Sequence, residues 1–96
     1  MKRPLVVGPI AEREVEEAAR WYEAREVGLG QAFVDEVLHT FDAIEAEPEV
    51  VPFLREPYRR KLLDRFPYAV IYKVTARRVY VRAVAHGRRR PGYWDI

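Results

Sequence analysis

The chain has 96 residues, of which 49% are apolar and none is cysteine. It therefore has the size and composition of a single small globular domain (residues 1–96), and disulfides and thiolate metal sites are excluded. No apolar run reaches the roughly 18–20 residues of a membrane span, and the N-terminus lacks a signal-peptide pattern, so we expect a cytoplasmic protein with no membrane partner. Charge is segregated, because residues 1–50 carry 5 Lys+Arg against 12 Asp+Glu whereas residues 51–96 carry 12 against 3; the basic half favours an acidic or polyanionic partner.

The first half predicts a short strand and a helical hairpin. Residues 5–7 are the strand candidate, which glycine and proline end. Two stretches with apolar residues at helical spacing predict helices over about 10–26 and about 30–46, separated by Gly28-Leu29-Gly30. Two amphipathic helices joined by so few residues should pack as an antiparallel hairpin.

Several side chains of the first predicted helix have an expected place. Trp21 and Tyr22 are expected at the interface between helix and sheet, because they are large and aromatic. The acidic run from Glu12 to Glu17 is expected on a solvated helix face.

The second half predicts a sheet. Residues 51–54 and 58–63 are strand candidates and could form one strand with an irregular start, whereas residues 68–74 and 79–85 predict two strong strands joined by a hairpin. The β-α-α-β-β-β order predicts an α+β fold, a two-layer sandwich with the helical hairpin on one face of an antiparallel sheet. The other face is expected to be half exposed, with aromatic and basic residues suited to binding. Simple alternation in the last strand predicts two sets of side chains on opposite faces: Val79, Val81, Ala83 and Ala85 on one, Tyr80, Arg82 and Val84 on the other.

Three short segments of the sequence carry a family resemblance. They are Ala18-Ala19-Arg20-Trp21-Tyr22, Arg65-Phe66-Pro67-Tyr68-Ala69-Val70-Ile71-Tyr72, and Ala83-Val84-Ala85-His86-Gly87-Arg88-Arg89-Arg90-Pro91-Gly92-Tyr93-Trp94. In this order, and at this chain length, they resemble the RelE/ParE superfamily of bacterial toxins over essentially the whole chain. The resemblance implies the two-layer fold and a cognate antitoxin, whose acidic C-terminal segment folds on the toxin. DNA would then be contacted only indirectly, through the antitoxin.

The resemblance leaves the target of the toxin open. RelE-like members cut messenger RNA on the ribosome, ParE-like members inhibit DNA gyrase, and a non-toxic binding member of the family is a third alternative. RNA-cutting relatives often carry an arginine in the central strand at the position that Ala69 occupies in this chain. Tyr68 and Val70 should point to the opposite sheet face and could not replace that arginine. The ParE-like alternative is therefore favoured over the RelE-like ribonuclease.

The candidate site residues are mostly basic and lie in the second half of the chain. RNA cleavage would need a base, an acid and cations that bind phosphate; the candidates for catalysis, should the protein be a ribonuclease, are His86, Arg88, Arg89 and Tyr93. Candidates for binding a partner or nucleic acid are Arg59, Arg60, Lys61, Arg65, Arg82 and Arg90.

Other interpretations of the same residues stay open. His86 could pin the tail by a hydrogen bond, and the arginine run could be a solvated tail or an antitoxin docking site. Tyr93 and Trp94 are expected to pack back on the domain. The chain has no serine and only two histidines, so serine-nucleophile chemistry is excluded and neither a metal site nor another cofactor is expected.

Overall fold

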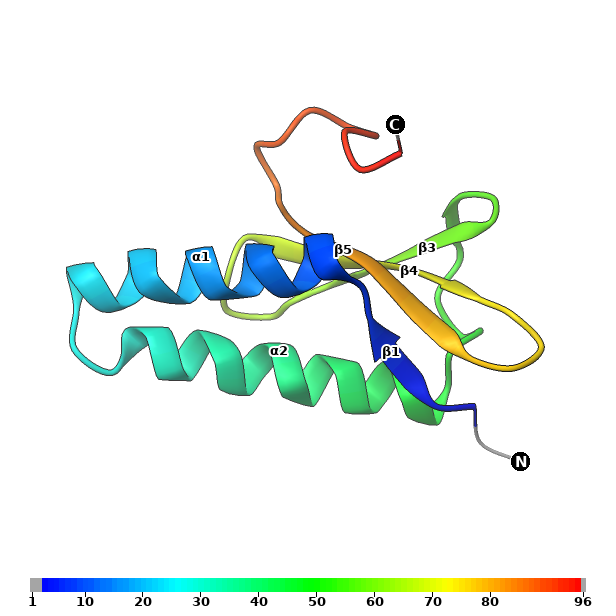
Figure 1. Ribbon diagram of the computed structural model, residues 1–96, viewed down its shortest axis with the longest axis horizontal. Helices are drawn as coiled ribbons and strands as arrows, with labels where there is room; N and C mark the ends of the chain where they lie inside the picture. The colour runs from blue at the N-terminus through cyan, green and yellow to red at the C-terminus, as the bar shows by residue number, and fades with distance from the viewer. Residues whose placement is uncertain (1–2, 96) are drawn as a thin grey trace.

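The computed structural model describes residues 3–95, in which two helices cover one face of a five-stranded sheet (Figure 1). The predicted β-α-α-β-β-β order is confirmed, and the irregular segment before the central strand divides into two strands at a turn with a cis Glu56–Pro57 bond. The elements are β1 (Leu5–Val7), α1 (Pro9–Arg25), α2 (Leu29–Ala46), β2 (Phe53–Arg55), β3 (Tyr58–Leu62), β4 (Tyr68–Val74) and β5 (Val79–His86).

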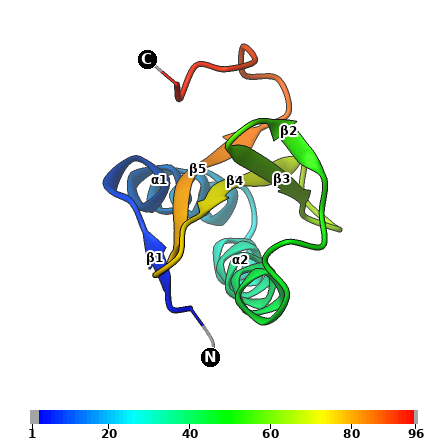
Figure 2. The same cartoon turned by 90° about the vertical axis from the view of Figure 1, so that its right-hand side faces the viewer.

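The strands lie in the order β1-β5-β4-β3-β2, so the first strand of the chain lies beside the last one (Figure 2). Four strands, from β2 to β5, form the predicted antiparallel pairs, whereas β1 runs parallel to β5. A parallel pair requires a long crossover connection, and the helical hairpin together with β2 to β4 provides it. The sheet is therefore mixed rather than wholly antiparallel.

The helical hairpin depends on close backbone contact at its turn. Gly28 adopts a φ of 90°, a left-handed conformation that glycine accepts readily. At Gly30 a Cβ atom would lie 2.5 Å from the carbonyl oxygen of Ala19, so only glycine lets α2 approach α1 this closely. The carboxylate of Glu23 in α1 accepts hydrogen bonds from the N–H groups of both glycines at 3.0–3.1 Å. In this way α1 caps the N-terminus of α2.

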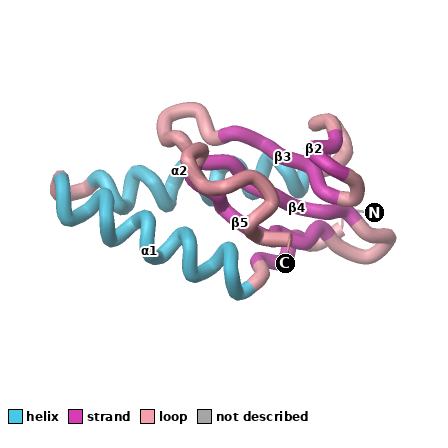
Figure 3. The backbone as a smooth tube through the Cα atoms, turned by 90° about the horizontal axis from the view of Figure 1, so that it is seen from above, coloured by secondary structure: helices cyan, strands magenta, loops and turns pink. Residues whose placement is uncertain are grey.

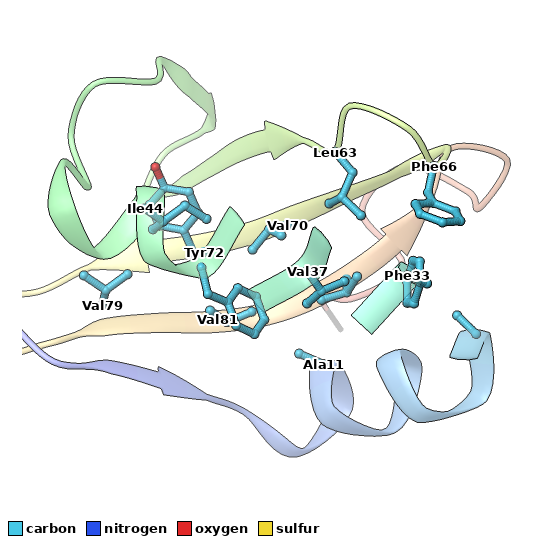
Figure 4. Packing of buried hydrophobic residues seen from close by; sticks show 13 residues of the cluster. Ala11, Phe33, Val37, Ile44, Leu63, Phe66, Val70, Tyr72, Val79 and Val81 are labelled. Atoms are coloured by element: carbon cyan, nitrogen blue, oxygen red, sulfur yellow. The ribbon is translucent and has the colours of Figure 1, made fainter. Parts of the chain in front are cut away.

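The main hydrophobic core lies between the helices and the sheet (Figure 4). The hydroxyl of the buried Tyr72 donates to the carbonyl of Pro48 at 2.9 Å, which satisfies its polar group in the core. The largest fully buried side chains are Phe33, Val37, Ile44, Val70, Tyr72, Val79, Val81 and Val84.

A β-bulge in β5 changes which side chains face the helices. Val81 and Ala83 pair with consecutive residues of β4, so Arg82 between them is an extra residue. The alternation restarts after it, and Val84 joins Val81 on the helix side while Ala83 and Ala85 face the other side of the sheet. The predicted assignment of faces is therefore wrong beyond Val81, because simple alternation cannot anticipate an inserted residue.

The residues after β5 (87–95, here called the tail) cross the sheet face that the helices leave uncovered (Figure 3). Trp94 is 4% exposed and packs against Tyr58, with 4.6 Å between ring centroids. It covers a second apolar cluster that includes Ala69, Ile71 and Ala83. The expectation that Trp94 packs back on the domain is confirmed.

The two aromatic residues near the end of α1 have different environments. Tyr22 packs between Phe33 and Phe66, at 5.4 and 4.9 Å between ring centroids, as predicted. Trp21 is 52% exposed, with the guanidinium of Arg25 3.7 Å above its ring. Its predicted place at the interface is wrong, because neighbouring helical residues point about 100° apart. Neither helix in residues 3–95 is long and apolar enough to span a membrane.

Candidate functional site

A cleft of about 520 Å³ opens on the sheet face opposite the helices, between β3, the end of β5 and the tail. Ala69, Ile71 and Trp94 lie at its base, and Leu62 on β3, which is 65% exposed, extends the apolar lining. This is the sheet face that the sequence indicated as a binding surface. The tail covers part of this sheet face, and the cleft lies next to the covered part.

The charged residues that line the cleft are all basic. Among the residues of the described chain that line it there is no Asp or Glu. The basic side chains come from three different elements, β2, β3 and the tail, together with the last residue of β5. They are Arg55, Arg60, His86, Arg89 and Arg90.

Glu14 anchors the tail from the helical layer. One of its carboxylate oxygens accepts the N–H of Val84 at 2.8 Å, and the other accepts the hydroxyl of Tyr93. Val84 lies beyond the stretch of β5 that pairs with β1, so its N–H faces an edge that Glu14, in α1, covers. The expectation that the whole acidic run is solvated is wrong for Glu14.

The environment of Tyr93 keeps its hydroxyl protonated. Burial raises the pKa of Tyr93 far above its ordinary value, and the hydrogen bond to Glu14 raises the pKa further. The guanidinium of Arg89 lies 3.9 Å from the centre of the Tyr93 ring. Tyr93 thus holds the tail in place and is a poor candidate for a general base.

The end of the tail has a second anchor. Asp95 forms an ion pair with Arg55 of β2, next to the contact between Trp94 and Tyr58. The tail is therefore attached to α1 at Tyr93 and to the β2–β3 edge of the sheet at its end. These attachments fix one wall of the cleft.

His86, at the end of β5, is the residue of the cleft best suited to proton transfer. Its Nδ1 atom accepts the N–H of Arg88 at 2.9 Å, and its ring packs edge-on against Tyr68 at 5.0 Å between centroids. The structure thus supports the interpretation that His86 pins the tail. In this arrangement Nε2 is the ring atom left to meet a ligand.

The structure brings five of the ten predicted site residues together at the cleft. These are Arg60, His86, Arg89, Arg90 and Tyr93, whereas the exposed Arg88 follows in the tail beside them.

The other four predicted residues lie elsewhere. Arg59 points its guanidinium toward the loop before β2, where it donates to two backbone carbonyls and stacks on Phe53 at 4.0 Å. Lys61 pairs with a β4 residue that faces the helices. Arg65 lies in the β3–β4 turn, and Arg82 is the bulge residue. Arg59 thus has a structural role that sequence reasoning did not predict.

Sequence reasoning missed two residues of the site, Glu14 and Arg55. A signal for Glu14 existed, because it lies three residues after the buried Ala11 and four before the buried Ala18, on the buried face of α1. For Arg55 there was no such signal, since its partner Asp95 is 40 residues away in the sequence.

Ala69 limits what the cleft can do chemically. It is 7% exposed and lies in the same cluster as Trp94, while Tyr68 and Val70 belong to the helix-side core as expected. Because alanine has no charged group, this position cannot supply a cation that stabilises a phosphate. The cleft can bind anions through its arginines and offers His86 for proton transfer. Within residues 3–95 no three His, Asp or Glu side chains gather into a metal site.

The arrangement of helices and strands has a counterpart of known structure. It matches a chain in the solved structure described as "Chromosomal ParDE TA system from P. aeruginosa", with a TM-score of 0.77 and 12% sequence identity, over 88% of this chain and 96% of that chain. The two chains therefore share a fold. The two-layer fold that the sequence resemblance implied is thereby confirmed. No protein-family model matches the sequence, and the comparison with curated proteins finds no match.

Proposed function

We propose that the protein is the toxin of a type II toxin–antitoxin module, a ParE-like growth inhibitor that acts on DNA gyrase and is neutralised by a cognate antitoxin. The observation that carries the proposal is the match to a chain of a ParDE toxin–antitoxin system over 96% of that chain. Fold alone does not determine function. The chemistry of the cleft supplies the second argument.

The base of the cleft favours inhibition without RNA cleavage. Removing one well-placed group that stabilises the transition state typically costs on the order of 10²–10³ in rate. Ala69 provides no such group, and Trp94 covers the cluster in which it lies. The hydroxyl of Tyr93 donates its hydrogen bond to Glu14 and is therefore not free to act on RNA. Of the four residues expected to act in a ribonuclease, His86 and Arg89 also line the cleft, but His86 accepts the N–H of Arg88 and Arg89 stacks on the ring of Tyr93.

The charge of the second half supports an acidic antitoxin. Residues 51–96 carry 12 Lys+Arg against 3 Asp+Glu, and this half forms β2 to β5 and the tail. An acidic segment that folds as it binds would be attracted to this layer, and apolar contacts would supply most of the affinity.

Induced expression in a bacterial host tests the proposal. We expect growth arrest with filamentous cells and intact messenger RNA, and recovery when the product of the neighbouring gene is co-expressed. Message cut at defined codons, and no longer cut in His86→Ala, would contradict the proposal in favour of a ribonuclease. Growth without arrest would identify a non-toxic binding protein instead.

A further inference from the structure

A groove of about 500 Å³ lies beside α1 and differs from the cleft, although both are bordered by Pro67, Tyr68, His86 and Arg89. It opens past Val81, where β1 no longer covers β5 and α1 runs alongside the strand instead (Figures 1 and 2). Residues of α1 line one side of this groove, here called the α1 groove, and the end of β5 and the tail line the other. The α1 groove is therefore bounded by two segments of opposite charge.

The α1 side of the groove is acidic and ends in an exposed aromatic ring. Glu14, Glu17 and Trp21 follow one another at intervals of three and four residues, which places them on one face of the helix. Glu14 is held by its bonds to β5 and the tail, whereas Glu17 is exposed and has no ion pair within residues 3–95. Trp21 is 52% exposed although Tyr22 and Tyr68 line the groove next to it. A large apolar ring and a carboxylate are thus both available to another molecule.

The opposite side of the α1 groove is basic. Arg89 is exposed, lies over the ring of Tyr93 and, like Glu17, has no ion pair within the described part of the chain. Its neighbours Arg88 and Arg90 are exposed as well. A wholly acidic partner would meet like charge on the α1 side, and a wholly basic one would meet like charge on the tail side. The groove therefore favours a partner that carries both charges beside an apolar group.

A second copy of the chain carries that combination in the required arrangement. Where opposite charges flank a two-fold axis, rotation by 180° places the acidic side of each copy on the basic side of the other, so the same surface binds itself. The charge of the whole chain acts in the same direction. The helical layer of each copy is acidic, and its sheet layer and tail are basic.

We infer that two copies of the chain associate through their α1 grooves about a two-fold axis. Glu17 of each copy pairs with Arg89 of the other, and the ring of Trp21 packs against the aromatic lining of the opposite groove. The charges set the orientation and specificity of the pair, while burial of Trp21 supplies most of the affinity. This contact goes beyond the proposed function and does not depend on the target of the protein.

Sedimentation of the purified full chain over a range of concentrations tests the association. We expect a monomer–dimer equilibrium in low salt with no larger species, because a two-fold contact is closed. The dissociation constant should rise at least about tenfold between roughly 50 and 500 mM salt, since the charge pairs lie near solvent. A chain that stays monomeric at about 0.5 mM in low salt would overturn the inference and leave the groove to a different partner. Oligomers that keep growing with concentration would overturn the two-fold arrangement.

Matched variants locate the contact, with circular dichroism to show that each one is folded. Trp21→Ala should weaken the dimer at least about tenfold, whereas Leu38→Ala, which shortens a 53% exposed leucine on α2, should change it less than about twofold. Glu17→Arg and Asp42→Arg make the same change of charge at exposed positions of α1 and α2. Only the first should weaken the dimer, by about three- to tenfold. Equal effects of the groove variants and their controls would refute the location.

Exchange of the charges tests the pairing itself. Glu17→Arg and Arg89→Glu should each weaken the dimer when studied alone, because both charge pairs then join like charges. An equimolar mixture of the two variants should dimerise within about threefold of the wild-type dissociation constant, because both pairs join opposite charges again. Mixing cannot repair a defect in folding. A mixture that is as monomeric as its components would overturn the pairing of Glu17 with Arg89.

The two tryptophans show where the copies meet. On dilution from dimer to monomer the indole N–H signal of Trp21 should shift in NMR spectra, and that of Trp94, buried in the cluster on the open sheet face, should not. A shift of Trp94 alone would place the contact at the cleft and overturn the inference. Because association is measured without reference to growth arrest or gyrase, failure of the proposed function would leave this result unchanged.

Discussion

Glu14 carries more of the structure than its place in an acidic run indicates. Its carboxylate joins α1 to the backbone of β5 and to the tail. A buried donor that loses its partner costs about 1–3 kcal/mol, more than the net gain from making the bond. Two donors depend on this one side chain, so its removal affects both the edge of β5 and the position of the tail.

Replacing Glu14 tests this role. Glu14→Ala should lower the free energy of unfolding by about 2–4 kcal/mol, because the N–H of Val84 and the hydroxyl of Tyr93 both lose their acceptor. Glu14→Gln keeps one acceptor oxygen and should lose less than half as much. Glu16→Ala, on the exposed face of the same helix, should change stability by less than about 0.5 kcal/mol. Chemical denaturation measures all three, and equal losses for Glu14→Ala and Glu16→Ala would contradict the account.

Tyr93 predicts how stability depends on alkaline pH. Its pKa is raised in the folded chain, so its contribution is complete below the ordinary tyrosine pKa of about 10 and is lost as the pH rises beyond it. Burial also raises the pKa values of Tyr22, Tyr68 and Tyr72, which act in the same direction. Between pH 10 and 12, unfolding free energy should fall less steeply in Tyr93→Phe, by up to about 1.4 kcal/mol per pH unit. Identical slopes for the variant and the wild type would show that Tyr93 ionises as easily in the folded chain as in the unfolded one.

At the scale of elements, the tail behaves as part of the sheet layer rather than as an appendage. Its two anchors reach α1 and β2, and Trp94 completes an apolar cluster on the open sheet face.

The two tryptophans of the chain provide a matched comparison of this point. Trp94→Ala should cost about 3–5 kcal/mol of unfolding free energy, as is typical of a buried tryptophan. Trp21→Ala, which removes a 52% exposed ring, should cost less than about 1 kcal/mol. Similar losses in calorimetry would show that the tail does not pack as described.

The helical hairpin makes a separate prediction. Gly30→Ala would place a Cβ atom 2.5 Å from a backbone oxygen of α1, and backbone cannot move aside as a flexible side chain can. We expect a loss of about 1–3 kcal/mol in spite of the better helix propensity of alanine. Gly87→Ala is the control, since its nearest contact would be an ordinary 3.6 Å. If thermal unfolding shows Gly30→Ala to be as stable as Gly87→Ala, the two helices are not in close contact at their turn.

The elements differ in how far the sequence could predict them. The helices and β4 follow from local periodicity, because each has one clear apolar face or a dense β-branched run. The faces of β5 beyond Val81 could not be predicted, because the bulge at Arg82 depends on pairing with β4 and leaves no local signal. The same holds for the cleft: His86 and the tail arginines could be predicted as candidates from residue type, whereas Arg55 comes to line the cleft only through the pairing of β2 with β3 in the folded sheet. The faces of β5 and the full set of cleft residues depend on contacts between residues far apart in the sequence, which local patterns do not contain.

At the scale of the whole molecule, the segregation of charge along the chain becomes a segregation between layers. The acidic first half forms β1 and the helical layer, and the basic second half forms most of the sheet and the tail (Figures 1 and 2). An acidic partner, as proposed above, would therefore be steered toward the sheet face, where the cleft lies. This polarity is independent of whether His86 is catalytic, and it agrees with a protein that acts by binding.

A gyrase supercoiling assay beside primer extension on ribosome-bound message tests the proposed function most directly, with the same purified chain in both. The account predicts inhibition of supercoiling that the antitoxin relieves, and no codon-dependent cuts in the message. His86→Ala should inhibit supercoiling within about threefold of wild type, because a side chain that only pins the tail contributes little to binding. Codon-dependent cuts by the wild-type chain, lost in His86→Ala and accompanied by unaffected supercoiling, would contradict the account and assign a ribonuclease.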